Sequence, residues 1–202
     1  MRIPAPATIS AAVEGVTDEA VVRKLITHVG AQVGTVYGRY GKSHLKARIA
    51  GYNNAARYAP WIVLVDLDQD AHCAPPVCAD WIPAPAALLC FRVAVRAIEA
   101  WLLADAETLA AFLGVARGKV ARDPEGLDRP KEAMVNLARG SRRRDILVDM
   151  VPREGSGRSE GPAYSSRLIE FVSSSWRPNI AAAQSDSLRR AIACLRRLAR
   201  PA

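Results

Sequence analysis

The chain has 202 residues, half of them hydrophobic, and a formal charge of +8 at pH 7. This length and composition fit one domain, or one domain with a helical extension, with enough apolar residues for a sizeable core. No apolar run approaches the length that crosses a bilayer, and the N-terminus lacks the apolar segment of a secretion signal. We therefore expect a soluble cytoplasmic protein that makes no membrane contact.

The first half of the chain alternates between two kinds of pattern. Short apolar runs predict four strands, at residues 7–13, 31–37, 61–65 and 87–95. Helical spacing of apolar residues predicts three helices, at residues 17–29, 43–57 and 98–113. Thr17 is the expected N-cap of the first helix. This alternation predicts an α/β fold with a mostly parallel, four-stranded, Rossmann-like sheet flanked by helices.

Two segments of the chain are expected to be irregular. After residue 114 the alternation of strands and helices gives way to helices alone. The proline-rich stretch 70–85 and the glycine- and serine-rich stretch 155–161 are expected to be loops. Helices are expected at 131–139 and 185–199. We therefore divide the chain into an α/β core, residues 1–114, and a mainly helical C-terminal extension packed on it, residues 115–202.

The positive charge lies entirely in the second of these parts. Residues 1–114 contain 10 basic and 10 acidic residues, whereas residues 115–202 contain 18 and 10. A basic extension favours a polyanionic partner such as DNA or RNA, although a solvated basic face is also common. The four cysteines, Cys73, Cys78, Cys90 and Cys194, are expected to be reduced thiols.

Acidic residues follow two of the expected strands. Glu14 follows the first strand, and Asp66 and Asp68 follow the third. The carboxyl ends of parallel strands share one edge of a sheet, and residues two apart in extended backbone point the same way. Because Mg²⁺ and Mn²⁺ bind carboxylate oxygens, we expect Asp66 and Asp68 to hold such an ion. Glu14 is then a third ligand or a general acid/base. Alternatively, Glu14 caps the following helix, and Asp68 is a solvated turn residue.

At residues 13–18, 64–68, 98–105 and 128–131, four sequence segments resemble the Toprim domain or a family of small Toprim-like proteins. VEGVTD at residues 13–18 and LVDLD at 64–68 resemble the two signatures of the Toprim domain, found in topoisomerases, primases and OLD-family nucleases. IEAWLLAD at 98–105 and DRPK at 128–131 resemble elements of the DUF4276 family of small Toprim-like bacterial proteins. The chain departs from that family in having an aspartate at position 18 and an additional arginine inside its DPK element.

The resemblance implies a Toprim-like fold and phosphodiester chemistry. It implies that Glu14 is the general acid/base and that Asp66 and Asp68 bind Mg²⁺. Glu99 is a further metal-ligand candidate, because related nucleases use extra acids for a second metal; pairing with Arg96 is the alternative. Asp105 is expected to serve helix packing or ion pairing. An ATPase partner in bacterial defence is implied by the family alone.

Basic residues are candidates for contact with phosphate. Lys131 is expected to stabilise charge on a scissile phosphate as a catalytic residue, or else to be a surface residue. A glycine-containing turn before Lys42 exposes backbone N–H groups to an anion. The three consecutive arginines at residues 142–144 either contact a nucleic-acid backbone or form a solvated helix end. The expected nucleic-acid contacts are Lys42, Arg142, Arg143 and Arg144.

These features predict a Mg²⁺-dependent, Toprim-type nuclease. Two alternatives remain open at this point. The first is a non-catalytic module that binds metal and either nucleic acid or a partner protein. The second is a phosphatase of the haloacid-dehalogenase type, because residues 61–68 resemble its strand and DxD signature.

Overall fold

A computed structural model describes residues 5–200, which form two compact units. Unit 1 combines the residues up to Val95 with those from Ser187 onward, and unit 2 is Arg96–Asp186. This division differs from the expected boundary at residue 114. The helices that follow Val95 belong to the second unit, and the last helix of the chain returns to the first.

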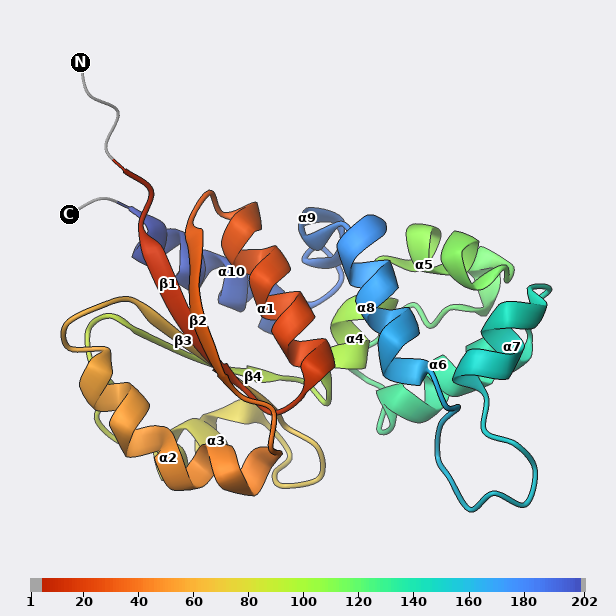
Figure 1. The fold of residues 1–202 in the computed structure, drawn as a ribbon, viewed down its shortest axis with the longest axis horizontal. Coiled ribbons are helices and arrows are strands. Elements are labelled where there is room, and N and C mark those ends of the chain that lie inside the picture. Colours follow the sequence, from red (N-terminus) through yellow and green to blue (C-terminus); the bar gives the residue numbers. More distant parts are fainter. Residues whose placement is uncertain (1–4, 201–202) are drawn as a thin grey trace. The chain divides into compact units, whose positions relative to one another are not determined.

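Unit 1 contains a four-stranded sheet in which all strands are parallel (Figure 1). The strands are β1 (Thr8–Val13), β2 (Gln32–Gly38), β3 (Trp61–Asp66) and β4 (Leu89–Ala94), in the order β2-β1-β3-β4. Each lies within two residues of its expected position. The Rossmann-like α/β fold is thereby confirmed, with a helical C-terminal part.

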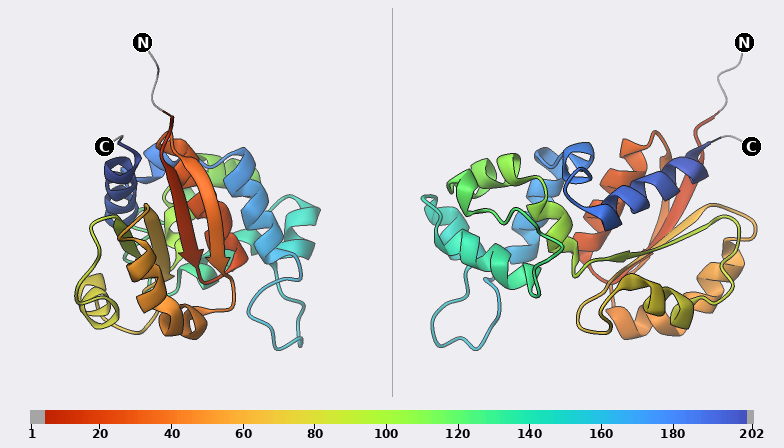
Figure 2. Two further views of the ribbon diagram at one scale, coloured as in Figure 1. Left: turned by 60° about the vertical axis from the view of Figure 1, so that its left-hand side comes forward. Right: turned by 180° about the vertical axis from the view of Figure 1, so that it is seen from behind.

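Helices cover both faces of this sheet. They are α1 (Val16–His28), α2 (Lys42–Ala55), α3 (Ala74–Trp81) and α10 (Asp186–Ala199). Figures 1 and 2 show α1 and α10 on one face, and α2 and α3 on the other. The chain moves from β1 outward to β2 and then back across the sheet to β3 and β4. Right-handed crossovers in these two directions place their helices on opposite faces.

Two local predictions in unit 1 are wrong. Helix α3 lies within the expected loop 70–85; its prolines occupy the first helical turn, where a missing N–H costs nothing. Helix α1 is preceded by Gly15 as its N-cap, and Thr17 is a buried residue inside the helix. The Glu19 N–H already donates to the Gly15 carbonyl at 3.1 Å, so helical hydrogen bonding starts two residues earlier than expected.

Unit 2 is helical in its described structure. Its helices are α4 (Ile98–Leu103), α5 (Ala106–Leu113), the short 3₁₀ helix η1 (Arg117–Lys119), α6 (Pro130–Arg139), α7 (Arg144–Met150), α8 (Tyr164–Ser174) and α9 (Pro178–Ala181). The single helix expected over residues 98–113 is interrupted at Asp105. No helix among residues 5–200 is both long and apolar enough to cross a bilayer.

Candidate functional site

The acidic residues at the ends of β1 and β3 lie at one edge of the sheet in unit 1. β1 and β3 are neighbours, and they lie where the chain's direction across the sheet reverses. Ligands of open α/β sheets bind at this reversal, beyond the carboxyl ends of the strands. We call Glu14, Asp66 and Asp68 the acidic edge. The fold therefore places Glu14 and Asp66 where such sheets carry their sites.

Glu14 and Asp66 are joined directly. The Asp66 main-chain N–H donates to Glu14 Oε1 at 2.8 Å. Burial raises the pKa of Glu14 to about 7, and the negative charges of Asp18 and Asp68 add to this rise. The Asp66 hydrogen bond and the positive charge of Lys42 oppose it. A carboxyl group with this pKa holds or releases a proton near neutral pH, as a general acid or base must.

The turn between β2 and α2 fixes the backbone beside Glu14. Gly38 has φ +96°, and a side chain there would clash with the carbonyl oxygen of Val13. The Gly41 N–H donates to the Glu14 carbonyl at 3.0 Å. Helix α2 then begins at Lys42. The glycines thus allow this turn to approach the end of β1 and bring the Lys42 side chain to the acidic edge.

Lys42 binds carboxylates in this structure. Its Nζ lies 2.6 Å from Asp68 Oδ2 and 2.8 Å from Asp70 Oδ2. Although burial lowers the pKa of Lys42, the hydrogen bonds to these aspartates raise it above its usual value. The expected contact of Lys42 with nucleic-acid phosphate is therefore not its arrangement here. The glycine-containing turn before Lys42 predicted a functional lysine, but the sequence did not predict its aspartate partners.

Asp68 does not continue the extended backbone of β3. The strand ends at Asp66, and Asp68 has φ +50° in a turn. The expectation that the Asp66 and Asp68 side chains point the same way assumed extended backbone, so its basis is wrong. The left-handed turn instead accompanies the ion pair of Asp68 with Lys42.

The acidic edge fits a divalent cation in its chemistry. Carboxylate oxygens are the donors that Mg²⁺ and Mn²⁺ prefer, and mutual repulsion contributes to the raised pKa of Glu14. A cation would relieve that repulsion. Over residues 5–200, no group of three or more His, Cys, Asp or Glu side chains is already arranged to hold a metal ion. Lys42 currently supplies the positive charge at Asp68.

Glu99 and Lys131 lie together in unit 2. Glu99 is 6% exposed, and its Oε1 accepts a hydrogen bond of 3.1 Å from the Tyr164 hydroxyl. Lys131 Nζ lies 5.4 Å from the centre of the Tyr164 ring and forms an ion pair with Glu160. Burial raises the pKa of Glu99, whereas the charge of Lys131 and the Tyr164 hydrogen bond lower it. We call Glu99, Lys131 and Tyr164 the buried cluster. The sequence offered no signal for Tyr164.

Asp105 forms an ion pair, as expected. Its carboxylate is fully buried and accepts hydrogen bonds from the Arg177 main-chain N–H at 2.9 Å and side-chain Nη2 at 2.7 Å. Although burial raises the pKa of Asp105, the bonds from Arg177 lower it below its usual value. Arg177 Nη2 also binds Glu107 at 2.8 Å. These contacts explain the break between α4 and α5, because Asp105 binds a segment far along the chain.

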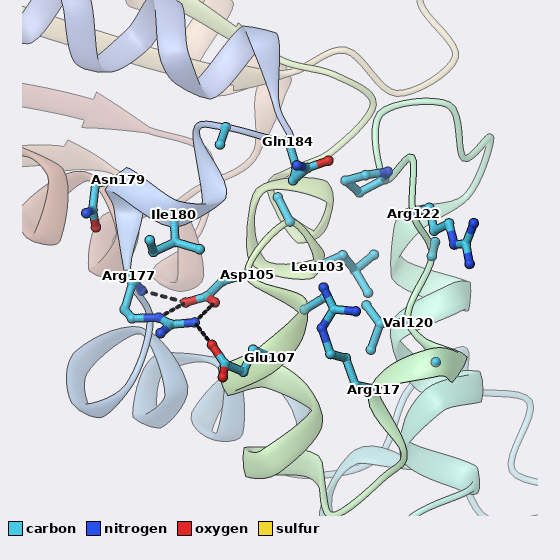
Figure 3. A pocket seen from close by; sticks show the side chains of 16 residues that line it. Leu103, Asp105, Glu107, Arg117, Val120, Arg122, Arg177, Asn179, Ile180 and Gln184 are labelled. Atoms are coloured by element: carbon cyan, nitrogen blue, oxygen red, sulfur yellow. Dashed lines mark hydrogen bonds and ion pairs between the residues drawn. The ribbon is translucent and has the colours of Figure 1, made fainter.

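A cavity of about 740 Å³ lies beside this ion pair (Figure 3). Its lining includes the apolar side chains of Leu103, Val120 and Ile180, together with three arginines. Asp105 and Glu107 compensate Arg177. The other two, Arg117 and Arg122, form no ion pair with any described residue. Figure 3 shows Arg117 reaching toward the middle of the lining, so the cavity presents positive charge that the described acids do not compensate.

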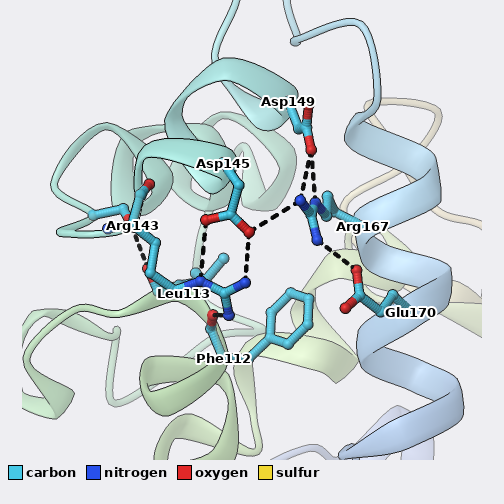
Figure 4. Close-up of polar contacts among 8 residues, drawn as sticks. Phe112, Leu113, Arg143, Asp145, Asp149, Arg167 and Glu170 are labelled. Atoms are coloured by element: carbon cyan, nitrogen blue, oxygen red, sulfur yellow. Dashed lines mark hydrogen bonds and ion pairs between the residues drawn. The ribbon is translucent and has the colours of Figure 1, made fainter.

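The three consecutive arginines are not a single exposed patch. Arg143 binds Asp145 through two nitrogens, at 2.6 and 3.2 Å, and the Phe112 carbonyl at 2.9 Å (Figure 4). Arg167 joins the same aspartate to Asp149 and Glu170. Arg143 therefore holds α7 to the end of α5 and is not displayed for phosphate. Its neighbours Arg142 and Arg144 are exposed, and no ion pair is found for either in residues 5–200.

Comparison of this chain with protein-family models, curated proteins and solved structures gives no match. The functional interpretation therefore rests on the chemistry of the two units themselves. In unit 1 that chemistry is a carboxyl group with a pKa near neutral, hydrogen-bonded to the neighbouring strand at the reversal of an α/β sheet.

Proposed function

We propose that the acidic edge hydrolyses phosphodiester bonds of nucleic acid with a divalent cation, Mg²⁺ or Mn²⁺. The observation that carries this proposal is the position of Glu14. It lies at the reversal of the sheet, its pKa is raised to about 7, and it is hydrogen-bonded to the end of β3. Proton-transfer groups need this pKa and this fixed placement.

The chain's own residues divide the work as follows. Glu14 takes or gives the proton, and the Asp66 N–H keeps its Oε1 in place. Asp66 and Asp68 would hold the cation. When bound, the cation would polarise the phosphate and lower the pKa of an attacking water. The exposed arginines Arg142 and Arg144 and the cavity residue Arg117 are the candidates for holding a polyanion.

One observation favours a second candidate, a module that binds without catalysis. Lys42 already pairs with Asp68, and residues 5–200 contain no ready-made group of metal ligands. If the Lys42 ammonium permanently takes the place of a metal cation, the acidic edge stabilises the fold and has no catalytic role. An ATPase partner rests on the resemblance alone.

The test is hydrolysis of labelled single-stranded DNA, duplex DNA and RNA with Mg²⁺, Mn²⁺ or EDTA. Bis-p-nitrophenyl phosphate and p-nitrophenyl phosphate added in parallel separate a phosphodiesterase from a phosphatase. We expect cation-dependent diester cleavage that Glu14→Gln and Asp66→Asn each reduce by at least about a hundredfold. The matched control is Glu154→Gln, which removes an exposed carboxylate from the 152–161 loop.

The outcome decides between the candidates. Cleavage by wild type that survives both substitutions would remove the acidic edge from the chemistry. Salt-dependent nucleic-acid binding without cleavage, unchanged by Asp66→Asn, would support the binding module. A cleavage rate that follows a pKa near 7, absent from the residual activity of Glu14→Gln, would support proton transfer by Glu14.

A further inference from the structure

Two cysteines of unit 1 face each other between the sheet and the C-terminal helix. Cys90 lies on β4 and is fully buried, and Cys194 lies on α10 and is 6% exposed. Both are free thiols, and their side chains are hydrogen-bonded to one another. We call these residues the thiol pair. The chain between them contains the whole of unit 2.

Strand and helix periodicity place one arginine beside each thiol. Residues two apart on a strand share a face, so Arg92 lies on the same side of β4 as Cys90. Residues three apart on a helix are neighbours, so Arg197 lies beside Cys194. Arg197 Nη2 lies 3.7 Å from Cys194 Sγ, and its Nη1 donates to the Ala87 carbonyl at 2.9 Å. The Arg92 side chain is hydrogen-bonded to both thiols.

These guanidinium groups lack a carboxylate partner. Within residues 5–200, neither Arg92 nor Arg197 forms an ion pair with an aspartate or glutamate. Arg92 is partly buried, where an uncompensated positive charge is costly. The hydrogen bond from Cys90 lowers the pKa of Cys194, and the hydrogen bonds from Arg92 and Arg197 and the charge of Arg92 lower it further. Burial instead raises the pKa of Cys90. Cys194 has the Arg197 guanidinium 3.7 Å from its sulfur and is the better placed to be the thiolate, with the fully buried Cys90 as the proton-bearing partner.

We propose that Cys90 and Cys194 are a redox-active pair that a peroxide oxidises to a disulfide, which joins the two segments of unit 1 by a covalent bond. This goes beyond the proposed hydrolysis and does not depend on it. A thiolate held by cations next to a second thiol is one part of the usual setting of oxidant-sensitive cysteines, and access to solvent is another. Cys194 is 6% exposed and Cys90 is fully buried, so Cys194 is the thiol that a peroxide would reach first.

The reaction balances with hydrogen peroxide as the oxidant. The Cys194 thiolate sulfur attacks one peroxide oxygen, the O–O bond breaks, and Cys194 sulfenic acid and hydroxide form. The Cys90 sulfur then attacks the Cys194 sulfur, the S–O bond breaks, and the hydroxyl group leaves with the Cys90 proton as water. Hydroxide takes up the proton that Cys194 lost on ionisation. Two thiols and one peroxide thus give one disulfide and two waters.

The disulfide would change the connectivity of unit 1. The segment from Ser187 onward is joined to the sheet by the chain only through unit 2. A bond between Cys90 and Cys194 attaches α10 to β4 directly and restricts the unfolded chain over a long loop. We therefore expect oxidation to raise the Tm of the protein by at least about 5 °C.

The experiment treats the full chain with equimolar hydrogen peroxide, blocks the remaining thiols by alkylation and maps them by peptide mass spectrometry. A Cys73→Ser, Cys78→Ser background removes the other two thiols. We expect a Cys90–Cys194 linked peptide, with oxidation slowed about tenfold by Arg92→Met. In Cys90→Ala, we expect Cys194 to stop at the sulfenic acid, which dimedone traps. Alkylation of both thiols in the peroxide-treated double-serine protein would overturn the proposal.

A second measurement needs no substitution. Protease cleavage in the exposed segment 153–159 separates the wild-type chain into two fragments, one with Cys90 and the other with Cys194. After oxidation, these fragments should remain joined on a denaturing gel without reductant and separate when reductant is added. Fragments that separate in both cases would contradict the proposal.

Discussion

Glu14 in unit 1 and Glu99 in unit 2 have pKa values that burial raises, but they differ in exposure and in the number of acidic neighbours. Glu99 is almost fully buried, with a tyrosine hydroxyl as donor, the lysine of the buried cluster as its positive neighbour, and one acidic neighbour, Glu160, which pairs with that lysine. Glu14 is partly buried; it also has a donor, the Asp66 N–H, and a positive neighbour, Lys42, but two aspartates raise its pKa further. A raised pKa alone therefore does not mark a reactive carboxyl group. Glu14 is the candidate because it is less buried, has two aspartates beside it and lies at the reversal of the sheet.

The largest expected difference between the two carboxyl groups is in activity. Glu14→Gln should lower cation-dependent hydrolysis by 10²–10⁴-fold, because the amide cannot transfer the proton. Glu99→Gln should change the same rate by less than about tenfold, because Glu99 is engaged by Tyr164 within unit 2. The measurement is single-turnover cleavage with saturating Mn²⁺. An equal loss in both variants would break the comparison and make Glu99 part of the reactive site.

The next effect concerns stability and belongs to the buried cluster. Tyr164→Phe removes the hydroxyl donor from the buried Glu99 carboxylate, and we expect a loss of about 1–3 kcal/mol in the free energy of unfolding. Urea unfolding followed by tryptophan fluorescence measures it, since Trp101 and Trp176 are buried in the same unit. The control is Tyr58→Phe, which removes a hydroxyl from an exposed ring of unit 1. Equal stabilities of Tyr164→Phe and the control would show that Glu99 does not need the tyrosine.

Much of the α/β framework was predictable, because it follows from local patterns. Apolar runs gave the four strands within two residues, and the acids at two strand ends marked the sheet edge. The errors came from contacts between distant residues. Asp105 breaks a helix to bind Arg177, 72 residues later, and Tyr164 meets Glu99 from 65 residues away. No local pattern shows either pairing, nor the capture of Lys42 by Asp68.

Ionisation of Glu14 should make the folded protein less stable as pH rises, and this direction is the test of its raised pKa. Because burial raises its pKa from 4.5 to about 7, folding favours the protonated form. Its favourable contribution is complete below pH 4.5 and is lost as pH rises through about 7. Glu14→Gln stays neutral and keeps an acceptor for the Asp66 N–H. At pH 8 in EDTA, we expect the variant to be about 1–2 kcal/mol more stable than wild type, after allowance for partial solvent access.

The test compares urea unfolding of wild type and Glu14→Gln between pH 4 and pH 8.5. Their difference should be near zero at pH 4 and grow to its full size above pH 7. A destabilised variant at pH 8 would mean that the ionised carboxylate is already compensated, as in the buried cluster. That result would remove the physical distinction between the two glutamates.

The smallest expected effect separates the two roles open to Lys42. Its ion pairs with Asp68 and Asp70 involve half-exposed carboxylates, so Lys42→Met should cost less than about 1 kcal/mol of stability. If the ammonium only occupies the place of a cation, its removal should tighten Mn²⁺ binding by up to about tenfold, measured by calorimetry. If Lys42 instead contacts substrate phosphate during the reaction, Mn²⁺ affinity should change little and KM for the diester should rise. Lys46→Met is the matched control, because Lys46 forms a similar exposed pair with Asp80 from the same helix. A Lys42→Met protein with unchanged Mn²⁺ affinity and unchanged KM would mean that Asp68 takes part in binding neither the cation nor the diester. Glu14 and Asp66 would then be the only functional residues of the acidic edge.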